Sequence, residues 1–538
     1  MKKSLLIIIS IITITAIKAD NDNNARKLLM AEKIIENFYV DSINDSKIVE
    51  QGIIAMLKEL DPHSIYSNKE ETKELTTPLQ GSFSGIGIQF QMLNDTLYVI
   101  QTISGGPSEK VGMRAGDKII SAGDSIISGV KRPDYTVKNI LQGPKGTNID
   151  VTVIRKGENA PIVFRITRDN IPIYSIDASY MINNTTGYIR VARFAESTGK
   201  EFRKALLELK KKGMKNVIVD LEDNGGGYLG SAVELASEFL NPGEVIVSTK
   251  ANRTGEYHEF PVETKGVMRE GKIVIMANQY TASAAEILSG AIQDHDRGVI
   301  VGRRTFGKGL VQRPFPFPDG TMIRLTVSRY MTPSGRLIQK PYKLGETDEY
   351  REDILHRYDA GEFTSADSIH FDESLKAYTL KKHRLVYGGG GIMPDKFVAI
   401  DTTGYSNYYR NLVAKGVLNR FAVTYVDKNR NNLKSRYRTI ENYIASFNIT
   451  EDHLRDLVDL GQREGVEYVD ADFEKSKKVM TTILKGLIAR DLFDTSSYFQ
   501  IVNSLNPIYN KAVEIITDDA QYSKILTEQS VIVASDSE

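Results

Sequence analysis

The sequence of 538 residues contains no cysteine and no tryptophan. Without cysteine there can be no disulfide bond, no thiol nucleophile and no thiolate metal ligand. An excess of charge of either sign is also lacking, because Lys plus Arg equals Asp plus Glu at 69 each. No overall field would draw such a protein to nucleic acid or to an anionic membrane. We therefore expect neither a nucleic-acid partner nor thiol chemistry.

Long apolar runs are scarce as well, and the clearest one lies at the start of the chain. Residues 5–17 are apolar apart from Ser and Thr, follow the basic pair Lys2 and Lys3, and precede the small residue Ala19. This pattern is typical of a signal peptide over residues 1–19, and its apolar part is shorter than the roughly 20 residues of a spanning helix. We expect an exported protein in the periplasm of a Gram-negative bacterium. An uncleaved anchor and peripheral membrane contact stay open.

The chain is too long for one hydrophobic core, and its pattern of apolar and glycine residues changes three times along its length. Residues 20–77 show helical spacing of apolar positions, whereas residues 78–169 consist of short strand patterns punctuated by glycine. Strand and helix patterns alternate over residues 170–400, and residues 401–538 read as helical again. The sequence thus predicts a multidomain α/β protein with a small β domain and helical regions at both ends. For the last region we expect a packing or interaction role.

The small β domain contains a glycine-containing loop, Gly85, Ile86, Gly87 and Ile88. Glycines there allow several backbone N–H groups to point into one concavity, which is a way to capture a terminal carboxylate. A glycine-rich hairpin would look the same in isolation. The order of the surrounding strands and short helix is more specific, and it resembles a PDZ domain with this loop in the carboxylate-binding position.

Ser283 stands between an apolar stretch, residues 272–277, and a run with helical spacing that begins at Ala284. A serine on such a strand-to-helix turn projects into the cleft at the carboxyl end of a parallel sheet, where α/β proteins bind ligands. The free N–H groups of the first helical turn can stabilise an oxyanion. The alternative is that Ser283 only caps the helix, as serine often does.

A second glycine cluster, Gly225, Gly226 and Gly227, follows the apolar strand at residues 216–221. It lacks the Lys-Ser/Thr of a phosphate-binding P-loop, which disfavours nucleotide binding. The remaining readings are a bare turn or a loop whose N–H groups approach a substrate carbonyl closely, as only glycine permits. In the second reading, N–H groups of Ala284 and of Gly226 or Gly227 form the oxyanion hole.

A serine nucleophile needs a base that takes its proton. His295 lies 12 positions after Ser283 on the same predicted helix, which places it roughly 18 Å away and excludes it. Lys308 lies between two glycines with apolar neighbours; burial could lower its pKa by the roughly 3 units that a base requires. Gln312, four residues on, could hold the amine without adding charge. A distant histidine as base and a solvated Lys308 are the alternatives.

Ser283, Lys308 and Gln312 are spaced 25 and then 4 positions apart. With the PDZ-like domain before them, they resemble the carboxy-terminal processing (tail-specific) proteases. The resemblance implies that Ser283 is the nucleophile, Lys308 the general base and Gln312 the residue that orients the lysine. Two positions depart from the family's Asp-Leu-Arg-x-Asn-Pro-Gly-Gly motif, because Glu222 replaces Arg and Gly225 replaces Pro. These departures concern the stiffness of the loop rather than the glycines that supply N–H groups.

The resemblance covers residues 25–400, including a Leu-Asp-Pro-His-Ser segment at 60–64. It implies a crotonase/ClpP-like α/β peptidase core, no metal or organic cofactor, protein substrates with apolar carboxyl-terminal tails, and a homo-oligomer, most simply a dimer. We therefore expect an exported serine endopeptidase that cleaves proteins near their carboxyl termini. The alternatives are an inactive PDZ-containing scaffold and, less compatible with a PDZ domain and export, an acyl-CoA enzyme on a similar core.

Overall fold

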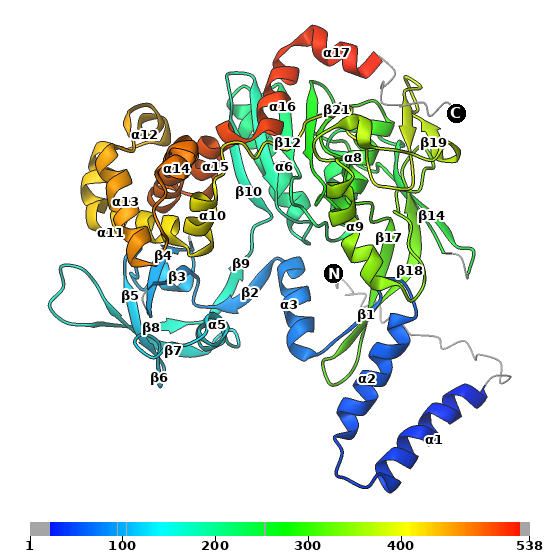
Figure 1. The fold of residues 1–538 in the computed structure, drawn as a ribbon, viewed down its shortest axis with the longest axis horizontal. Coiled ribbons are helices and arrows are strands. Elements are labelled where there is room, and N and C mark those ends of the chain that lie inside the picture. The colour runs from blue at the N-terminus through cyan, green and yellow to red at the C-terminus, as the bar shows by residue number, and fades with distance from the viewer. Residues whose placement is uncertain (1–21, 94, 104, 252–253, 528–538) are drawn as a thin grey trace, which may run out of the picture.

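The computed structural model describes residues 22–93, 95–103, 105–251 and 254–527, so the predicted signal peptide lies outside the described residues. Three bodies fill most of the molecule (Figure 1): a core of sheets and helices, a small β lobe, and a helical bundle beside that lobe. A hairpin of two helices, α1 and α2, projects from the side of the core. Within the described ranges, no helix is both long and apolar enough to cross a bilayer.

The N-terminal region consists of α1 (Asp22–Phe38), α2 (Asp45–Lys58), β1 (Ile65–Ser67) and α3 (Lys69–Gln80). Asn44 and Asn68 cap α2 and α3 by accepting backbone hydrogen bonds, as short polar side chains do before a helix. Strand β1 pairs with β18 of the core, with Ile65 opposite Arg324. The prediction of an all-helical region over residues 20–77 is wrong for this strand. Its three residues are too few to carry a periodic signal.

The β lobe is an antiparallel sheet in the order β3-β4-β5-β7-β8, with β6 attached to β5. Its alternating strands bury Leu97, Ile119 and Val151 between sheet and helices. The missed helix α5 has only eight residues, too short for a clear pattern. The elements are β2 (Ser82–Gly85), β3 (Ile88–Leu93), β4 (Thr96–Thr102), α4 (Pro107–Lys110), β5 (Lys118–Ala122), β6 (Ser125–Ile126), α5 (Asp134–Leu141), β7 (Asn148–Ile154), β8 (Ile162–Thr167) and β9 (Asp169–Pro172).

The core contains a six-stranded sheet in the order β10-β11-β12-β15-β16-β21, parallel from β11 onward. A second, antiparallel sheet has the order β1-β18-β13-β14, with β17 also paired to β18. The elements are β10 (Ile176–Met181), β11 (Thr186–Val191), α6 (Thr198–Lys211), β12 (Asn216–Asp220), α7 (Leu229–Ser237), β13 (Val245–Lys250), β14 (Tyr257–Pro261), β15 (Ile273–Ala277), α8 (Ala284–Asp294), β16 (Val299–Gly302), β17 (Leu310–Pro316), β18 (Met322–Met331), α9 (Thr347–Asp359), β19 (Lys376–Tyr378), β20 (Leu385–Tyr387) and β21 (Lys396–Phe397).

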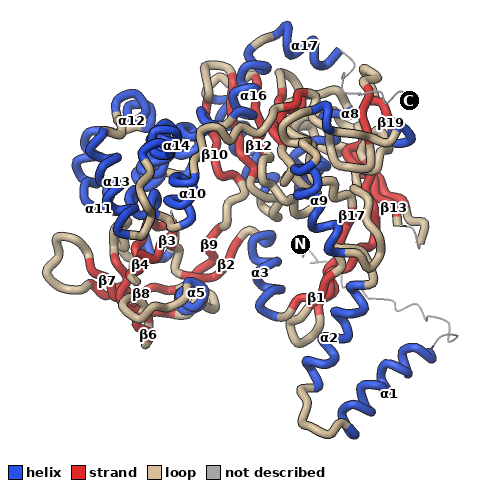
Figure 2. The backbone as a smooth tube through the Cα atoms, viewed as in Figure 1, coloured by secondary structure: helices blue, strands red, loops and turns tan. Residues whose placement is uncertain are grey.

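The central parallel strands are apolar throughout because helices cover both faces of their sheet. Val217 and Val219 of β12 pack on α6, α7 and α8, whereas Ile218 between them points to the opposite face. That opposite face is covered by α16 (Pro507–Thr517) and α17 (Asp519–Thr527), through residues such as Ile508. The C-terminal region therefore completes the core of the α/β domain, as Figure 2 lets the reader follow.

The other C-terminal helices form a bundle with its own apolar core. They are α10 (Asn407–Ala414), α11 (Val417–Arg436), α12 (Ile440–Ser446), α13 (Glu451–Arg463), α14 (Asp470–Leu492) and α15 (Thr495–Val502). Gly416 adopts the left-handed conformation (φ 66°) and separates α10 from α11. The bundle contacts the β lobe, where Lys156 donates to the carbonyl oxygen of Lys428 at 3.4 Å.

Candidate active site

Ser283 occupies a strained turn between strand β15 and helix α8. Its φ is 57° and its ψ is −118°, a region that side-chain-bearing residues avoid. Such strain costs on the order of 1–3 kcal/mol and persists where the surrounding structure enforces it. Here the backbone N–H of Ser283 donates to Glu286 Oε2 at 2.8 Å. A sharp, exposed strand-to-helix turn is how α/β hydrolases present a nucleophilic serine.

The glycine loop after β12 lies directly against this turn. A Cβ added to Gly226 would lie 2.7 Å from Ser283 Cβ and 2.9 Å from Ala284 N, so only glycine fits there. The N–H of Gly226 donates to Asn224 Oδ1 at 2.8 Å, which removes Gly226 from the predicted oxyanion donors in this arrangement. The N–H groups of Gly227 and Ala284 find no acceptor among the described residues. They are the two donors that stay free for an oxyanion.

Glu286 joins the serine turn to the loop that carries Lys308. Its fully buried carboxylate accepts from the N–H groups of Ser283, Gly307 and Lys308 and from Thr305 Oγ1, at 2.5–2.9 Å. Burial raises the pKa of Glu286, and these hydrogen bonds oppose the rise. One side chain thus fixes both loops at once. The predicted site does not include Glu286.

Lys308 lines the same cleft as Ser283, and its side chain is largely but not fully buried. Burial, and then the positive charge of Arg324, lower the pKa of Lys308 to about 8, against smaller opposing effects of Glu286 and Asp61. Over the described part of the chain its amine forms no hydrogen bond, including none to Ser283 Oγ. Catalytic hydrogen bonds are often long in the absence of substrate and tighten in the complex.

Gln312 also lines the cleft, but its amide is engaged away from Lys308. Gln312 Nε2 donates to the carbonyl oxygen of Leu310 and to Thr326 Oγ1, both at 3.2 Å. Thr326 Oγ1 in turn donates to Asp61 Oδ1 at 2.8 Å. The structure therefore brings Gln312 into the site without the predicted contact to the lysine amine.

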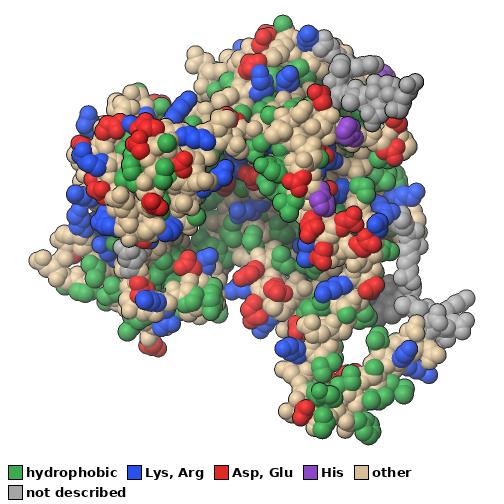
Figure 3. Space-filling model, viewed as in Figure 1, with side chains coloured by type: hydrophobic (Ala, Val, Ile, Leu, Met, Phe, Trp, Pro, Cys, Tyr) green, Lys and Arg blue, Asp and Glu red, His purple; other side chains and the backbone are tan. Residues whose placement is uncertain are grey.

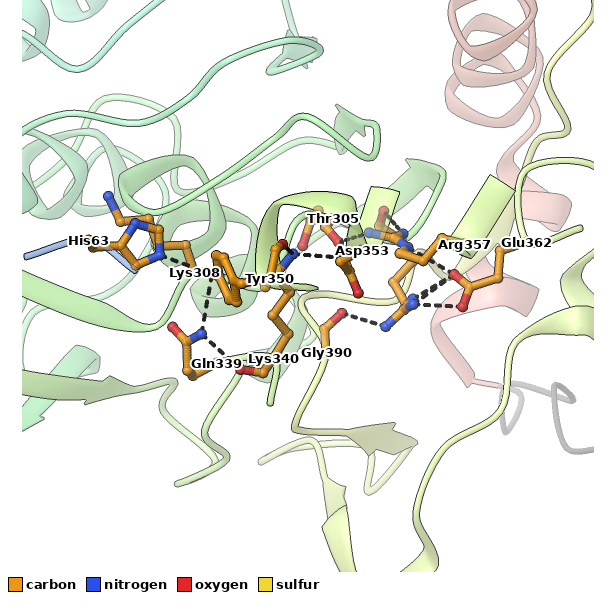
Figure 4. Close-up of polar contacts among 12 residues, drawn as sticks. His63, Thr305, Lys308, Gln339, Lys340, Tyr350, Asp353, Arg357, Glu362 and Gly390 are labelled. Atoms are coloured by element: carbon orange, nitrogen blue, oxygen red, sulfur yellow. Dashed lines mark hydrogen bonds and ion pairs between the residues drawn. The ribbon is translucent and has the colours of Figure 1, made fainter. Parts of the chain in front are cut away.

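The segment before α3 brings a histidine beside Lys308. Figure 4 shows the Lys308 side chain running next to the His63 ring, whose Nε2 lies 2.9 Å from Tyr350 Oη of α9. Burial, and then the charge of Lys308, lower the pKa of His63 to about 3, so the ring is neutral. Behind it, Lys340 donates to Asp353 at 2.8 Å. His63 belongs to the Leu-Asp-Pro-His-Ser segment that the family resemblance includes, but that motif does not indicate that the ring lies beside Lys308, and Tyr350 has no local sequence signal that points to this site.

Tyr330 of β18 closes the back of the site. Its buried hydroxyl lies between the carbonyl oxygens of Ser283, at 3.1 Å, and Lys308. The cleft in front has a volume of about 500 Å³ and is bordered on one side by α3, through residues such as Leu75 and Leu79. Figure 3 shows the molecule hollowed between the β lobe and the core. A peptide could therefore reach Ser283 from the side of the β lobe.

The predicted carboxylate loop of the β lobe is formed by Gly85 at the end of β2, then Ile86 and Gly87, with Ile88 starting β3. Gly87 has a φ of 78°, and the carbonyl oxygen of Ile86 accepts from Ser108 N–H and Oγ. Those contacts engage the carbonyl oxygen of Ile86 within the domain. The N–H groups of Ile86 and Gly87 meet no acceptor in the ranges that the structure describes, as a carboxylate loop requires.

Comparisons with known proteins identify the family of the chain. Residues 185–345 match the sequence model of peptidase family S41, residues 84–163 match that of the PDZ domain, and residues 408–494 match a family of unknown function (DUF8443). The carboxy-terminal-processing protease of Bartonella bacilliformis is 34% identical over 338 residues, which cover 61% of this chain and 76% of the relative. The chain belongs to the carboxy-terminal processing proteases of family S41. It is thus a serine-type peptidase with a PDZ domain, acting on peptide substrates.

Two further matches are of the same kind. The carboxy-terminal processing protease CtpB of Bacillus subtilis is 32% identical over 325 residues, covering 60% of this chain and 67% of the relative. Among solved structures, a photosystem II D1 C-terminal processing protease shares 27% identity over 58% of this chain and 89% of that one, with a TM-score of 0.34. The predicted fold class, a peptidase core with a PDZ domain and helical regions at both ends, is confirmed for the protease.

Within the described residues, no cluster of three or more His, Asp or Glu side chains is arranged to hold a metal ion. The groups that line the cleft around Ser283 are an alcohol, the Lys308 side chain with its amine, and two free N–H groups. They can move a proton and stabilise an oxyanion, which are the two requirements of acyl transfer from an amide.

Proposed function

We propose that the protease is an exported endopeptidase that cleaves proteins near their carboxyl termini with a Ser283–Lys308 dyad. The observation that carries this proposal is the juxtaposition of a serine on a strained turn with a buried lysine whose pKa is lowered to about 8. A lysine with that pKa is partly neutral near neutral pH and can act as a base. A solvated lysine could not.

The reaction follows from the positions of the groups. Neutral Lys308 takes the hydroxyl proton as Ser283 Oγ attacks the peptide carbonyl, and the N–H groups of Gly227 and Ala284 stabilise the oxyanion. The lysine ammonium then gives the proton to the leaving amine, which releases the new amino terminus. Water, deprotonated by the same lysine, hydrolyses the acyl-enzyme ester. Gln312 would orient the amine only after exchanging its contact with Thr326, so we place that role in the substrate complex.

The PDZ domain would select the substrate. The N–H groups of Ile86 and Gly87 suit a terminal carboxylate, and the partly exposed side chains of Ile88 and Phe90 on β3 suit an apolar tail. Helix α3 borders both the catalytic cleft and a cavity on the PDZ side of the molecule, which is lined by Lys73 of α3 and Ser84 of β2. Helix α3 thus lies between the catalytic cleft and the side of the molecule on which β2 leads to the PDZ loop.

Export to the periplasm follows from the predicted signal peptide, and it remains part of the proposal rather than a property of the described residues.

We also propose a homodimer formed through α1 and α2. Leu29, Phe38 and Val40 of this hairpin are 60%, 83% and 88% exposed, and such a cluster of apolar side chains marks a contact surface. A Leu29→Glu, Phe38→Glu variant should be monomeric by light scattering where the native chain is dimeric. Binding to vesicles without self-association would instead assign the hairpin to the membrane.

Cleavage of a soluble protein bearing an apolar carboxyl-terminal tail tests the dyad. Ser283→Ala and Lys308→Ala should each reduce cleavage by at least 1,000-fold while leaving binding of the tail peptide unchanged. Ser289→Ala, the same substitution two turns along α8, is the matched control because Ser289 only donates to the carbonyl oxygen of Ala285. Full activity in Lys308→Ala would refute the dyad. No cleavage by the native protein, with intact peptide binding, would favour the inactive scaffold.

A further inference from the structure

The loop that carries the oxyanion donors is held from behind by the C-terminal helices. Glu222, which stands where the family motif has arginine, points away from the cleft and is 7% exposed. Its Oε1 accepts from Asn506 Nδ2 at 2.6 Å. Asn506 caps α16, accepting from Ile508 N–H with its Oδ1 at 2.9 Å. One amide side chain thus starts the helix and holds the loop.

Neighbouring contacts reinforce the same junction. Arg190 donates to Asp220 Oδ2 at 2.6 Å and to the carbonyl oxygen of Glu222 at 3.1 Å. The guanidinium lies over the ring of Phe499 from α15, 4.8 Å from its centroid. Tyr188 also donates to Asp220, at 2.5 Å, and packs edge-on against Tyr509 of α16. The base of the loop is therefore enclosed by side chains from α15 and α16.

The loop transmits this support to the serine turn. Two residues after Glu222, the carbonyl oxygen of Asn224 accepts from Ala282 N–H at 2.9 Å, directly before Ser283. The side chain of Asn224 accepts from Gly226 N–H at 2.8 Å, which turns that N–H away from the cleft and leaves Gly227 N–H free. A shift of Glu222 would thus move both the nucleophile and an oxyanion donor.

We propose that Asn506 is a positioning residue for catalysis, which acts through Glu222 to fix the oxyanion loop, and that the C-terminal extension is thereby part of the catalytic unit. The proposal rests on the proposed function of Ser283 and Gly227. Burial, and then the neighbouring Asp220, raise the pKa of the Glu222 carboxyl above its usual range, so the group depends on the donors around it. Arg190 and Arg303 are the charged groups that oppose this rise.

A pair of substitutions that reverses the hydrogen bond provides the test. Asn506→Asp keeps the oxygen that caps α16 but replaces the donor with a second oxygen facing Glu222. The assay is run at pH 9, above the Glu222 pKa of about 8, so that Glu222 does not supply the proton for a new hydrogen bond. We expect kcat to fall at least tenfold with KM changed less than twofold, since oxyanion contacts form in the transition state. Glu222→Gln alone retains an acceptor and should stay within threefold of the native kcat. The double variant restores one donor and one acceptor and should recover kcat to within threefold.

Asn510→Asp is the matched control, because it makes the same change on α16 at an exposed residue that donates to the carbonyl oxygen of Ser504. Equal kcat in Asn506→Asp and this control would overturn the proposal, as would a double variant no faster than Asn506→Asp alone. Should Asn506→Asp fold poorly, Asn506→Ser keeps a helix cap that is too short to reach Glu222 and should show the same loss of kcat.

Hydrogen exchange separates this proposal from the proposed function. The amides of residues 222–228 should exchange at least tenfold faster in Asn506→Asp than in Asn510→Asp, whether or not any substrate is cleaved. Unchanged exchange would overturn the positioning role even in an active enzyme. If exchange is faster but the native protein cleaves nothing, the positioning role of Asn506 would be supported and the proposed protease activity rejected.

Discussion

The pH dependence of cleavage follows from the surroundings of Lys308. Its pKa is lowered from 10.5 to about 8, first by burial and then by Arg324. At pH 7 about one amine in ten is then neutral, against about one in 3,000 for an ordinary lysine. The site thus gains roughly 300-fold in active base, equivalent to about 3 kcal/mol. We expect kcat/KM to rise about tenfold per pH unit at low pH and to level off near pH 8.

The part of the pH profile in which kcat/KM rises with pH is its acid limb. Removing Arg324 should shift this limb in a defined direction. Because the guanidinium disfavours the ammonium form, Arg324→Gln raises the pKa of Lys308, and the limb shifts to higher pH. Activity at pH 7 falls, whereas activity above pH 10 stays near the native value. Arg329→Gln, a change of the same kind on the same strand, is the control because Arg329 does not contribute to the pKa of Lys308.

The assay is kcat/KM for a tail-bearing peptide between pH 6 and 10.5, in the native protein and the two arginine variants. Lys308→Arg should be inactive at every pH, since a guanidinium does not lose its proton in this range. An acid limb in Arg324→Gln that stays in place or moves to lower pH would refute the electrostatic reasoning. A native limb centred near 10.5 would refute the burial of Lys308.

Three further results are expected. Gly226→Ala should reduce cleavage at least 100-fold with the fold retained, because its Cβ would lie 2.8 Å from the carbonyl oxygen of Ala282; native-like kcat would contradict this close approach. Glu286→Gln turns one acceptor oxygen into a donor among four donors and should lower the free energy of unfolding by about 2–4 kcal/mol in denaturant titrations; an unchanged midpoint would contradict it. Lys308→Met should be more stable than the native chain by up to about 3 kcal/mol at pH 7. The native-state pKa lies below the unfolded one, so this gain should vanish as pH rises from about 8 to 10.5.

Local patterns were sufficient to predict the elements that present the nucleophile. The apolar run before Ser283 and the helical spacing after it define β15 and α8 within two residues, because strand and helix periods are properties of neighbouring side chains. The same holds for β12 and the glycine loop. The sequence also indicated Lys308, because it lies between two glycines with apolar neighbours and matches the spacing of the family resemblance. These parts of the site depend on short stretches of chain.

The residues that sequence reasoning missed reach the site from distant segments. Tyr330 lies on β18 and Tyr350 on α9, and neither has a neighbour in sequence that marks it as functional. His63, before α3, lies in the Leu-Asp-Pro-His-Ser segment, but that motif does not indicate that its ring packs beside Lys308. The oxyanion donors show the same limit. Three glycines in a row look equivalent in sequence, yet the Asn224 side chain engages the N–H of Gly226 and leaves that of Gly227 free. Only the folded loop distinguishes them.

The apolar strands predict that both faces of the parallel sheet are covered, and the C-terminal helices cover one of these faces. A strand such as β12 with Val217, Ile218 and Val219 in succession has to be covered on both faces. Helices α6, α7 and α8 cover one face and are close in sequence, whereas the cover of the other face comes from α16 and α17, nearly 300 residues after β12. A chain cut at residue 400 would expose Ile218, and it would also lose Asn506. The helices that complete the core are thus the same ones that carry Asn506, so the proposed positioning of the glycine loop and the covering of the sheet would be lost together.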